Sequence, residues 1–395
     1  MDPLFNSGLS VSVVAVVLIK VVVVFVFLLI ATMLMVWFER KVISDMQNRI
    51  GPNRAGPWGI LQTLADGIKL FFKEPMVPDQ ADRLIFRIAP YLSFVPAFLT
   101  FSIVPMGGIF APGHDGTVSI LGHDTFLQLA DPPVGILIAL ACSSIAVYGV
   151  MLAGWSSGSK YPLLGSVRAS AQMVSYEAAL GLSIVAVVLA SGTLSTHAIV
   201  EAQSHHFGDW NVWGLGVVPF LIFVVAATAE MERPPFDLLE AEQELVAGFS
   251  TEYSAIRFAL FYLASFMNVI TISAIMVTLF LGGPSGPLLF GPDWIWPFVW
   301  FFAKLTLFLY MFVWFRATLP RVRYDQLMDL GWKVLIPLSL GWLLLLSALK
   351  ISGDEDWNPV IVAAVGGAVT VGAILVLRVA IHAGAERRRL GELEA

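Results

Sequence analysis

Charged residues are scarce in this chain of 395 residues: Asp, Glu, Lys and Arg together make up 13%, against about 25% in an ordinary soluble chain. Hydrophobic residues make up 57%, and the mean hydropathy is +0.80. This composition leaves no room for a large soluble domain, so it excludes cytosolic enzymes, transcription factors and secreted disulfide scaffolds. It predicts an all-α polytopic membrane protein, with residues 1–395 forming a single integral membrane domain.

Cysteine and histidine are also rare. The single cysteine, Cys142, cannot pair within the chain, and one thiol cannot ligate an iron–sulfur cluster or a structural zinc ion. Five of the six histidines fall in predicted outer loops, so we expect no haem inside the spans. The sequence has no Walker A, GxGxxG or HExxH motif, which argues against nucleotide binding or hydrolysis by this chain alone.

Apolar runs of about 20 residues with few charges predict nine transmembrane helices, because a charge near the bilayer centre costs roughly 2.5–3.5 kcal/mol. They lie near residues 12–38, 86–110, 133–155, 169–191, 212–230, 258–281, 294–315, 333–349 and 359–380. Twenty of the 23 basic residues then fall on one face, the exceptions being Lys20, Lys304 and Lys350. The positive-inside rule predicts an outer N-terminus and a cytoplasmic C-terminus.

The predicted cytoplasmic loop at 39–83 contains a Gly/Pro turn cluster followed by apolar residues at helical spacing. These residues are Trp58, Leu61, Leu64, Ile68, Phe71 and Phe72. The spacing predicts an amphipathic helix lying in the membrane interface. Such a helix is either a simple surface anchor or one wall of a site entered sideways from the lipid, where Asp66 and Lys69 meet an amphiphilic substrate.

A second predicted cytoplasmic loop, at 230–257, carries seven acids and two arginines. Proline residues end the span before it, and Asp237, Glu240 and Glu244 then fall on one face of a predicted helix, where like charges repel. One interpretation is a solvated acidic linker. The other is a partly buried helix, because apolar residues interleave the acids. Burial and mutual repulsion would prepare such carboxylates to carry protons.

Three ionisable residues lie inside predicted spans and are functional candidates for that reason. Glu177 is nine residues beyond Arg168, or roughly 13 Å deep at 1.5 Å per residue. Lys304 is near the middle of the seventh span, whereas Lys20 is close enough to the outer surface to snorkel. The residues alone fit either an ion or proton carrier or a membrane arm of a larger enzyme.

Five long motifs at these segments resemble those of one family of respiratory complex I membrane subunits, which includes the H subunit of bacterial NADH:quinone oxidoreductase and mitochondrial NADH dehydrogenase subunit 1. They read ERKVISDMQNRIGPNRAGPWG, LADGIKLFFKEP, GSVRASAQMVSYE, AEMERPPFDLLEAEQELVAGFSTEY and RVRYDQLMDLGWK. The resemblance covers the first eight spans. The extra ninth helix and basic tail, at 359–395, are similar to those of longer bacterial members.

The resemblance implies a subunit of a proton-translocating NADH:quinone oxidoreductase in the bacterial plasma membrane, with its inner loops in the cytoplasm. Ubiquinone or menaquinone would be the substrate, while FMN and the iron–sulfur clusters would lie on partner subunits. This chain would hold no NADH or iron–sulfur site. The implied partners are the quinone-site and terminal iron–sulfur subunits, small membrane subunits, antiporter-like subunits and membrane lipid; no nucleic acid is expected.

The expected site residues form two groups, and none acts by direct chemistry. The quinone chamber and its entrance would be framed by Glu39, Arg40, Asp66, Lys69 and Phe71. The proton path would include Glu177, Tyr176, Arg168, Glu230, Arg233, Asp237, Glu240, Glu242, Glu244, Glu252 and Arg316, joined by the intramembrane Lys304. Quinone reduction would change the charge in the chamber and the protonation of the loop carboxylates. Glu177 would pass this change to the antiporter-like subunits.

The sequence departs from the family at one position of the path. Many members carry a glutamate in the sixth span where this chain has Ser265, whose hydroxyl can orient water but cannot hold a proton in this pH range. Two alternatives stay open: the equivalent subunit of a membrane-bound hydrogenase or other dehydrogenase complex, and a free-standing ion transporter. Inverted repeats typical of transporters are not evident.

Overall fold

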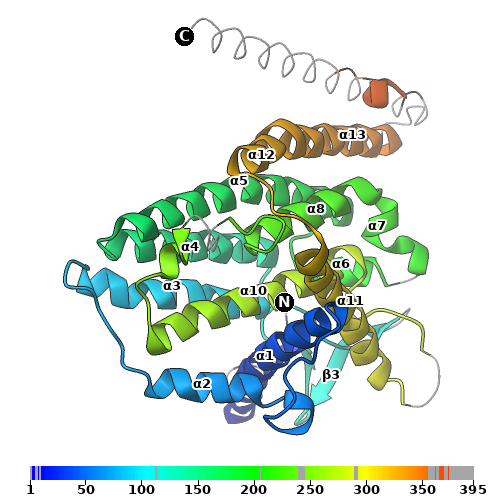
Figure 1. Cartoon of the computed structure of the whole chain (residues 1–395). Coiled ribbons are helices and arrows are strands. Elements are labelled where there is room, and N and C mark those ends of the chain that lie inside the picture. Colours follow the sequence, from blue (N-terminus) through cyan, green and yellow to red (C-terminus); the bar gives the residue numbers. More distant parts are fainter. Residues whose placement is uncertain are drawn as a thin grey trace, which may run out of the picture.

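The computed structural model describes residues 2–4, 8, 10–111, 114–204, 206–238, 245–288, 292–354, 361, 364–368 and 372. Long helices dominate this part of the chain, which confirms the all-α class (Figure 1). The long uninterrupted helices are α1 (Val11–Met46), α3 (Arg83–Phe101), α4 (Gly135–Ser156), α5 (Lys160–Ser191), α10 (Ala255–Phe280) and α11 (Ile295–Thr318). A further helical run joins α12 (Tyr324–Leu330), a π-helical turn (Gly331–Leu335) and α13 (Ile336–Asp354).

Seven helical segments in the described part are long and apolar enough to cross a bilayer: the six helices above and the run Tyr324–Ser352. The chain is therefore a multi-pass membrane protein. The direction in which it crosses the membrane stays a prediction. Most of the predicted ninth span and the basic tail lie outside the described residues.

Two predicted spans have different boundaries in the structure. The fifth span, predicted at 212–230, is broken: α7 (Asn211–Gly214) ends before Gly216, whose φ of 77° no helix allows, and α8 (Val217–Glu230) has only 14 residues. The second span, predicted to reach residue 110, ends at Phe101 because Pro105 and the glycines after it interrupt helical hydrogen bonding.

Two small antiparallel hairpins follow α3 in place of the predicted helix end. Strand β1 (Phe110–Ala111) pairs with β2 (His114–Asp115), and β3 (Thr117–Ile120) pairs with β4 (His123–Phe126). The remaining short elements are α6 (Thr196–Ala202) and the 3-10 turns η2 (Pro57–Gly59), η3 (Phe207–Asp209) and η4 (Gly248–Ser250). These elements connect the long helices and leave the bundle itself helical.

The first helix is longer than the sequence predicted. Since α1 continues to Met46, Glu39 and Arg40 lie on a membrane helix, not in a loop. The amphipathic helix predicted after the turn cluster is confirmed as α2 (Gln62–Phe72), which packs against α1 and α10 (Figure 1). The first inner segment therefore lies against the bundle, where it can contribute to a site.

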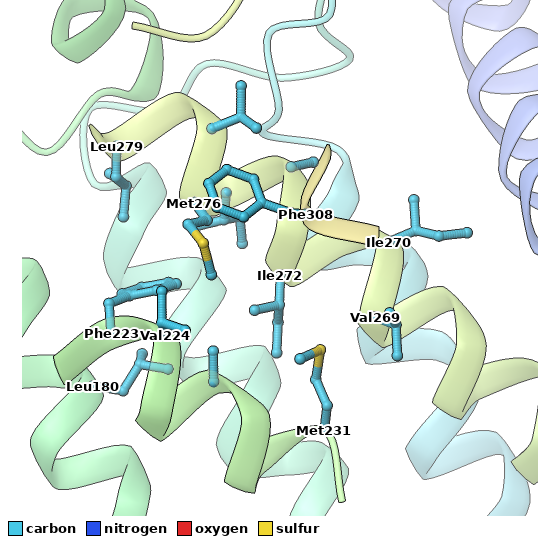
Figure 2. Close-up of a cluster of buried hydrophobic side chains, with 14 of the residues drawn as sticks. Leu180, Phe223, Val224, Met231, Val269, Ile270, Ile272, Met276, Leu279 and Phe308 are labelled. Atoms are coloured by element: carbon cyan, nitrogen blue, oxygen red, sulfur yellow. The ribbon is translucent and has the colours of Figure 1, made fainter. Parts of the chain in front are cut away.

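Helix α10 occupies the middle of the bundle. Of its most apolar 18-residue window, 83% is buried inside the chain, compared with 11% for the run Tyr324–Ser352 on the outside. Figure 2 shows part of the central packing, where Phe223 of α8 and Leu180 of α5 belong to the same buried cluster as Ile272 and Met276 of α10. This packing fixes α5, α8 and α10 relative to one another.

Candidate functional site

Glu39 lies buried on α1 between two arginines from distant parts of the chain. The Nη1 atom of Arg233 donates to the two carboxylate oxygens at 3.0 and 3.3 Å, and Arg316, in the last turn of α11, donates to Oε1. Hydrogen bonds in which both partners are charged are about twice as strong as neutral ones. This cluster ties α1, α11 and the segment after α8 together.

The backbone after α8 turns sharply, which brings Arg233 to α1. Glu232 adopts a φ of 55°, a left-handed conformation that few residues other than glycine adopt. The Val322 N–H donates to the Pro235 carbonyl at 3.2 Å and so fixes the turn against the segment after α11. The guanidinium of Arg233 lies 4.3 Å from the ring centre of Phe266 on α10, close enough for a cation–π contact.

Asp237 continues this loop and is also buried. One of its carboxylate oxygens accepts a hydrogen bond from Nη2 of Arg321 at 3.0 Å. Asp237 lies in non-helical backbone, and the other members of its predicted helix, together with their neighbour in the proton-path group, lie outside the described residues: Glu240, Glu242 and Glu244. Glu252 is half-buried beyond η4. The acidic helix therefore stays a prediction.

Asp66 joins α2 to α1. It accepts a hydrogen bond from Arg40 at 2.8 Å and one from Gln62 at 3.4 Å, and Nζ of Lys69 is 3.7 Å away. Partial burial opposes the charged form of Asp66, but the hydrogen bond and the charge of Arg40 outweigh it, so its pKa is lowered from the usual value. The apolar side chains of this segment are exposed: Trp58, Leu61, Leu64, Ile68, Phe71 and Phe72.

A cavity of about 470 Å³ lies between the cluster around Glu39 and the cluster around Asp66. Its polar wall includes Glu39, Arg40 and Arg316, and its aromatic wall includes Tyr262 and Phe266 of α10. The volume falls within the roughly 300–1,000 Å³ typical of small-molecule sites. Four of the five residues predicted from sequence for the chamber or its entrance (Glu39, Arg40, Asp66 and Lys69) thus belong to the two clusters at this cavity, while Phe71 faces outward on α2.

Two further acids have hydroxyl groups as partners in place of arginines. Ser143 of α4 donates to Oε1 of Glu230, the last residue of α8. The next residue, Ser144, donates to Oε1 of Glu177 on α5. The two carboxylates also interact electrostatically with each other. The structure therefore brings together two acids that the sequence placed in different segments.

A second cavity, of about 100 Å³, borders Glu230. Glu230 and Ser143 line it, as do Asn268 and Ser265 of α10. Most of the remaining lining is apolar, so the cavity has only a few polar groups along it. Ser265, the residue at the position where many family members have an acid, lies on the wall of this cavity.

Tyr176 and Arg168 both contact the outer helical run. The Tyr176 hydroxyl donates to the Leu327 carbonyl at 2.8 Å, and its ring centre lies 5.8 Å from that of Phe236 in the acidic loop. The guanidinium of Arg168 lies 5.8 Å from the ring centre of Tyr324. Both residues therefore connect α5, which carries Glu177, to α12.

Lys304 has a different environment from the other predicted path residues. Its ammonium group donates to the carbonyls of Leu281, Gly283 and Ser285 at 2.7, 3.0 and 2.7 Å, and lies 4.3 Å from the ring centre of Trp210. Within the described ranges it forms no ion pair with a carboxylate. The lysine thus caps the turn that ends α10.

The sequence did not identify several partners of the acids: Ser143, Ser144, Arg321 and Gln62. The one signal for the serines was a pair of hydroxyls in an otherwise apolar run, ALACSSIAV. Serine is common in transmembrane helices and often bonds its own backbone. The helix packing, and not the local sequence, decides that these two serines meet carboxylates.

Comparison with known proteins gives consistent matches over most of the chain. A family model described as NADH dehydrogenase matches residues 19–347. The H subunit of NADH-quinone oxidoreductase from Frankia alni is 50% identical over 374 residues, covering 93% of this chain and 79% of the relative. The proteins of the same name from Frankia casuarinae and Streptomyces avermitilis are 49% and 46% identical, covering 93% and 87% of this chain and 79% and 75% of their own length.

Fold and site together define a class: a polytopic membrane protein with a charged cavity against its helices and with buried carboxylates in the bundle. The family model and the relatives make the assignment specific. The chain belongs to the NADH dehydrogenase family, together with the H subunits of NADH-quinone oxidoreductase.

Proposed function

We propose that this chain is the membrane subunit of a proton-translocating NADH:quinone oxidoreductase that forms much of the quinone chamber and couples quinone reduction to proton transfer. The observation that carries the proposal is the position of Glu39. It lies on the wall of the larger cavity, and Arg233 joins it to the segment that begins at Glu230. A charge change in the cavity is thereby linked to an acid inside the bundle.

The larger cavity has the chemistry that a quinone requires. Tyr262 and Phe266 offer aromatic surface for the ring, and the N–H groups of Arg40 and Gln62 can donate to its carbonyl oxygens. The exposed apolar face of α2 provides a route for a long lipid-soluble tail. Reduction of a quinone to a quinol takes up two electrons and two protons. The electrons would come from an iron–sulfur cluster of a partner subunit, since this chain is proposed to hold neither that cluster nor NADH.

The two hydroxyl-paired acids would respond to this change of charge. Glu230 and Glu177 have hydroxyl partners and form no ion pair with the described residues, so in this proposal either acid would take up or release a proton without breaking one. Glu177 would pass the change to antiporter-like partner subunits. The same path would include Asp237, Arg168, Tyr176, Glu252 and the loop acids Glu240, Glu242 and Glu244. Lys304 would join this path only if it exchanges its carbonyl partners for a carboxylate during turnover.

The proposal also places the molecule in the cell. The basic residues favour a bacterial plasma membrane orientation in which the larger cavity opens on the cytoplasmic side. There the quinone-site and terminal iron–sulfur subunits would cover it, while small membrane subunits and antiporter-like subunits would lie alongside.

Glu177→Gln in the assembled complex tests the function. We expect proton pumping and NADH:quinone turnover to fall together, because an amide cannot exchange the proton that coupling requires. Both rates are measured in proteoliposomes containing the complex. Glu201→Gln is the control, since Glu201 is an exposed residue of α6. Full pumping by Glu177→Gln would contradict the proposal.

A further inference from the structure

Two adjacent serines of α4 reach acids on two different helices. Consecutive residues of an α-helix point about 100° apart, so neighbouring side chains normally face different partners. Here Ser143 meets Glu230 of α8, and Ser144 meets Glu177 of α5. One turn of α4 therefore supplies a hydroxyl to each of the two carboxylates of the proposed proton path.

Ser144 has two acceptors but only one proton to donate. Besides Glu177, its hydroxyl lies 3.1 Å from the carbonyl of Leu140, one turn earlier on α4. A hydroxyl has one donor hydrogen and two acceptor lone pairs. The geometry thus offers two arrangements. Ser144 donates to an ionised Glu177, or it donates to Leu140 and accepts the proton of a protonated Glu177.

Both protonation states of Glu177 therefore keep a hydrogen-bonded partner without movement of a helix. Rotation of one hydroxyl adjusts the hydrogen bond to either state. The O–H bond of protonated Glu177 is the one that forms or breaks, and its proton would come from, or pass to, Glu230, the neighbouring acid of the proposed path. An acid without such a partner would leave one of its two states unsatisfied, which is costly in a poorly hydrated site.

We propose that Ser144 is a positioning residue that adapts to the protonation state of Glu177 and thereby sets the rate at which this acid exchanges its proton. This inference rests on the proposed function, because it assumes that Glu177 changes protonation during turnover. Ser143 provides the matched comparison on the same helix, since its bond goes to Glu230.

The test uses Ser144→Ala and Ser144→Cys in the assembled complex. Hydrogen bonds to charged groups contribute enough to change an equilibrium about tenfold, so we expect Ser144→Ala to lower quinone-reductase turnover about tenfold. The thiol of Ser144→Cys is a weaker donor and should give an intermediate loss. Ser144→Thr retains the hydroxyl and should restore most of the turnover. If Ser144→Ala fails to assemble, Ser144→Cys tests the proposal in its place, because cysteine has nearly the same side-chain volume as serine.

Infrared difference spectra between the oxidised and reduced complex separate this role from simple packing. The carboxyl band of Glu177, assigned by its loss in Glu177→Gln, should shift in Ser144→Ala and return in Ser144→Thr. Ser143→Ala should leave that band in place. Ser157→Ala is a further control at the end of the same helix, because the Ser157 hydroxyl donates to a backbone carbonyl, that of Ala153, at 2.7 Å.

The outcomes separate the two proposals. An unshifted band and normal turnover in both Ser144→Ala and Ser144→Cys, beside an impaired Glu177→Gln, would overturn the inference about Ser144 alone. Normal turnover and pumping in Glu177→Gln would overturn the proposed function as well. A shifted band with lowered turnover that threonine restores supports the inference.

Discussion

Glu39 and Glu230 are equally buried, at 5% and 4% exposed, yet their partners differ in kind. Two arginines compensate the charge of Glu39, whereas Glu230 receives one serine hydroxyl, and its second oxygen has no hydrogen-bond partner among the described residues. Burial alone therefore does not determine what a carboxylate can do. The arginine-paired acid holds three segments in place, and the hydroxyl-paired acid is the one that, in the proposed function, changes its protonation.

Glu39→Gln should have the largest effect on stability. Without the carboxylate, Arg233 and Arg316 lose the acid that they share, and breaking a buried ion pair in this way costs about 3–5 kcal/mol. We expect a large fall in the thermal unfolding midpoint of the complex and in the amount assembled. Glu74→Gln, at an exposed position, is the control. A complex as stable as the wild type would show that the two arginines do not need the charge of Glu39.

Lys304→Met removes a buried cation whose hydrogen bonds, within the described residues, go to backbone carbonyls. Leaving buried carbonyls without donors costs about 1–3 kcal/mol, so the unfolding midpoint should fall less than in Glu39→Gln. Protons pumped per electron should stay unchanged in the complex that assembles, if the lysine only caps α10. Lys73→Met is the exposed control. A lower pumping ratio with normal stability would instead place Lys304 in the proton path.

Asp66→Asn examines an arginine-paired acid near the surface and should have the smallest effect. Exposed pairs contribute about 0–1 kcal/mol. The lowered pKa of Asp66 means that its contribution to stability is fully present above the pKa of the unfolded chain and is lost as pH falls through the lower folded value. The midpoints of wild type and variant should therefore differ slightly at neutral pH and converge under acid conditions. A difference that grows as the pH falls would contradict this account.

The sequence predicted the helices more completely than their contacts. Hydrophobic runs identified the long spans, and 3.6-residue spacing identified α2, because both signals are local. The predicted end of α3 was wrong because apolar composition outweighed the effect of Pro105 and the glycines after it. The break between α7 and α8 at Gly216 was also missed, because the residues on both sides of it are apolar.

The partners of the acids depend on contacts between distant segments. Glu39 and Arg233 are 194 positions apart, and Ser144 and Glu177 are 33 apart. A resemblance to a family placed these acids in one site, but helix packing decides which acid meets an arginine and which meets a hydroxyl. No spacing rule within one segment contains that information.

The most direct test of the central claim is the infrared difference spectrum of the assembled complex before and after quinone reduction, recorded for wild type and for Glu230→Gln. The account predicts a carboxyl band that changes on reduction in the wild type and is absent in Glu230→Gln. An unchanged difference spectrum in Glu230→Gln would contradict it, because the hydroxyl-paired acid would then not take part in coupling.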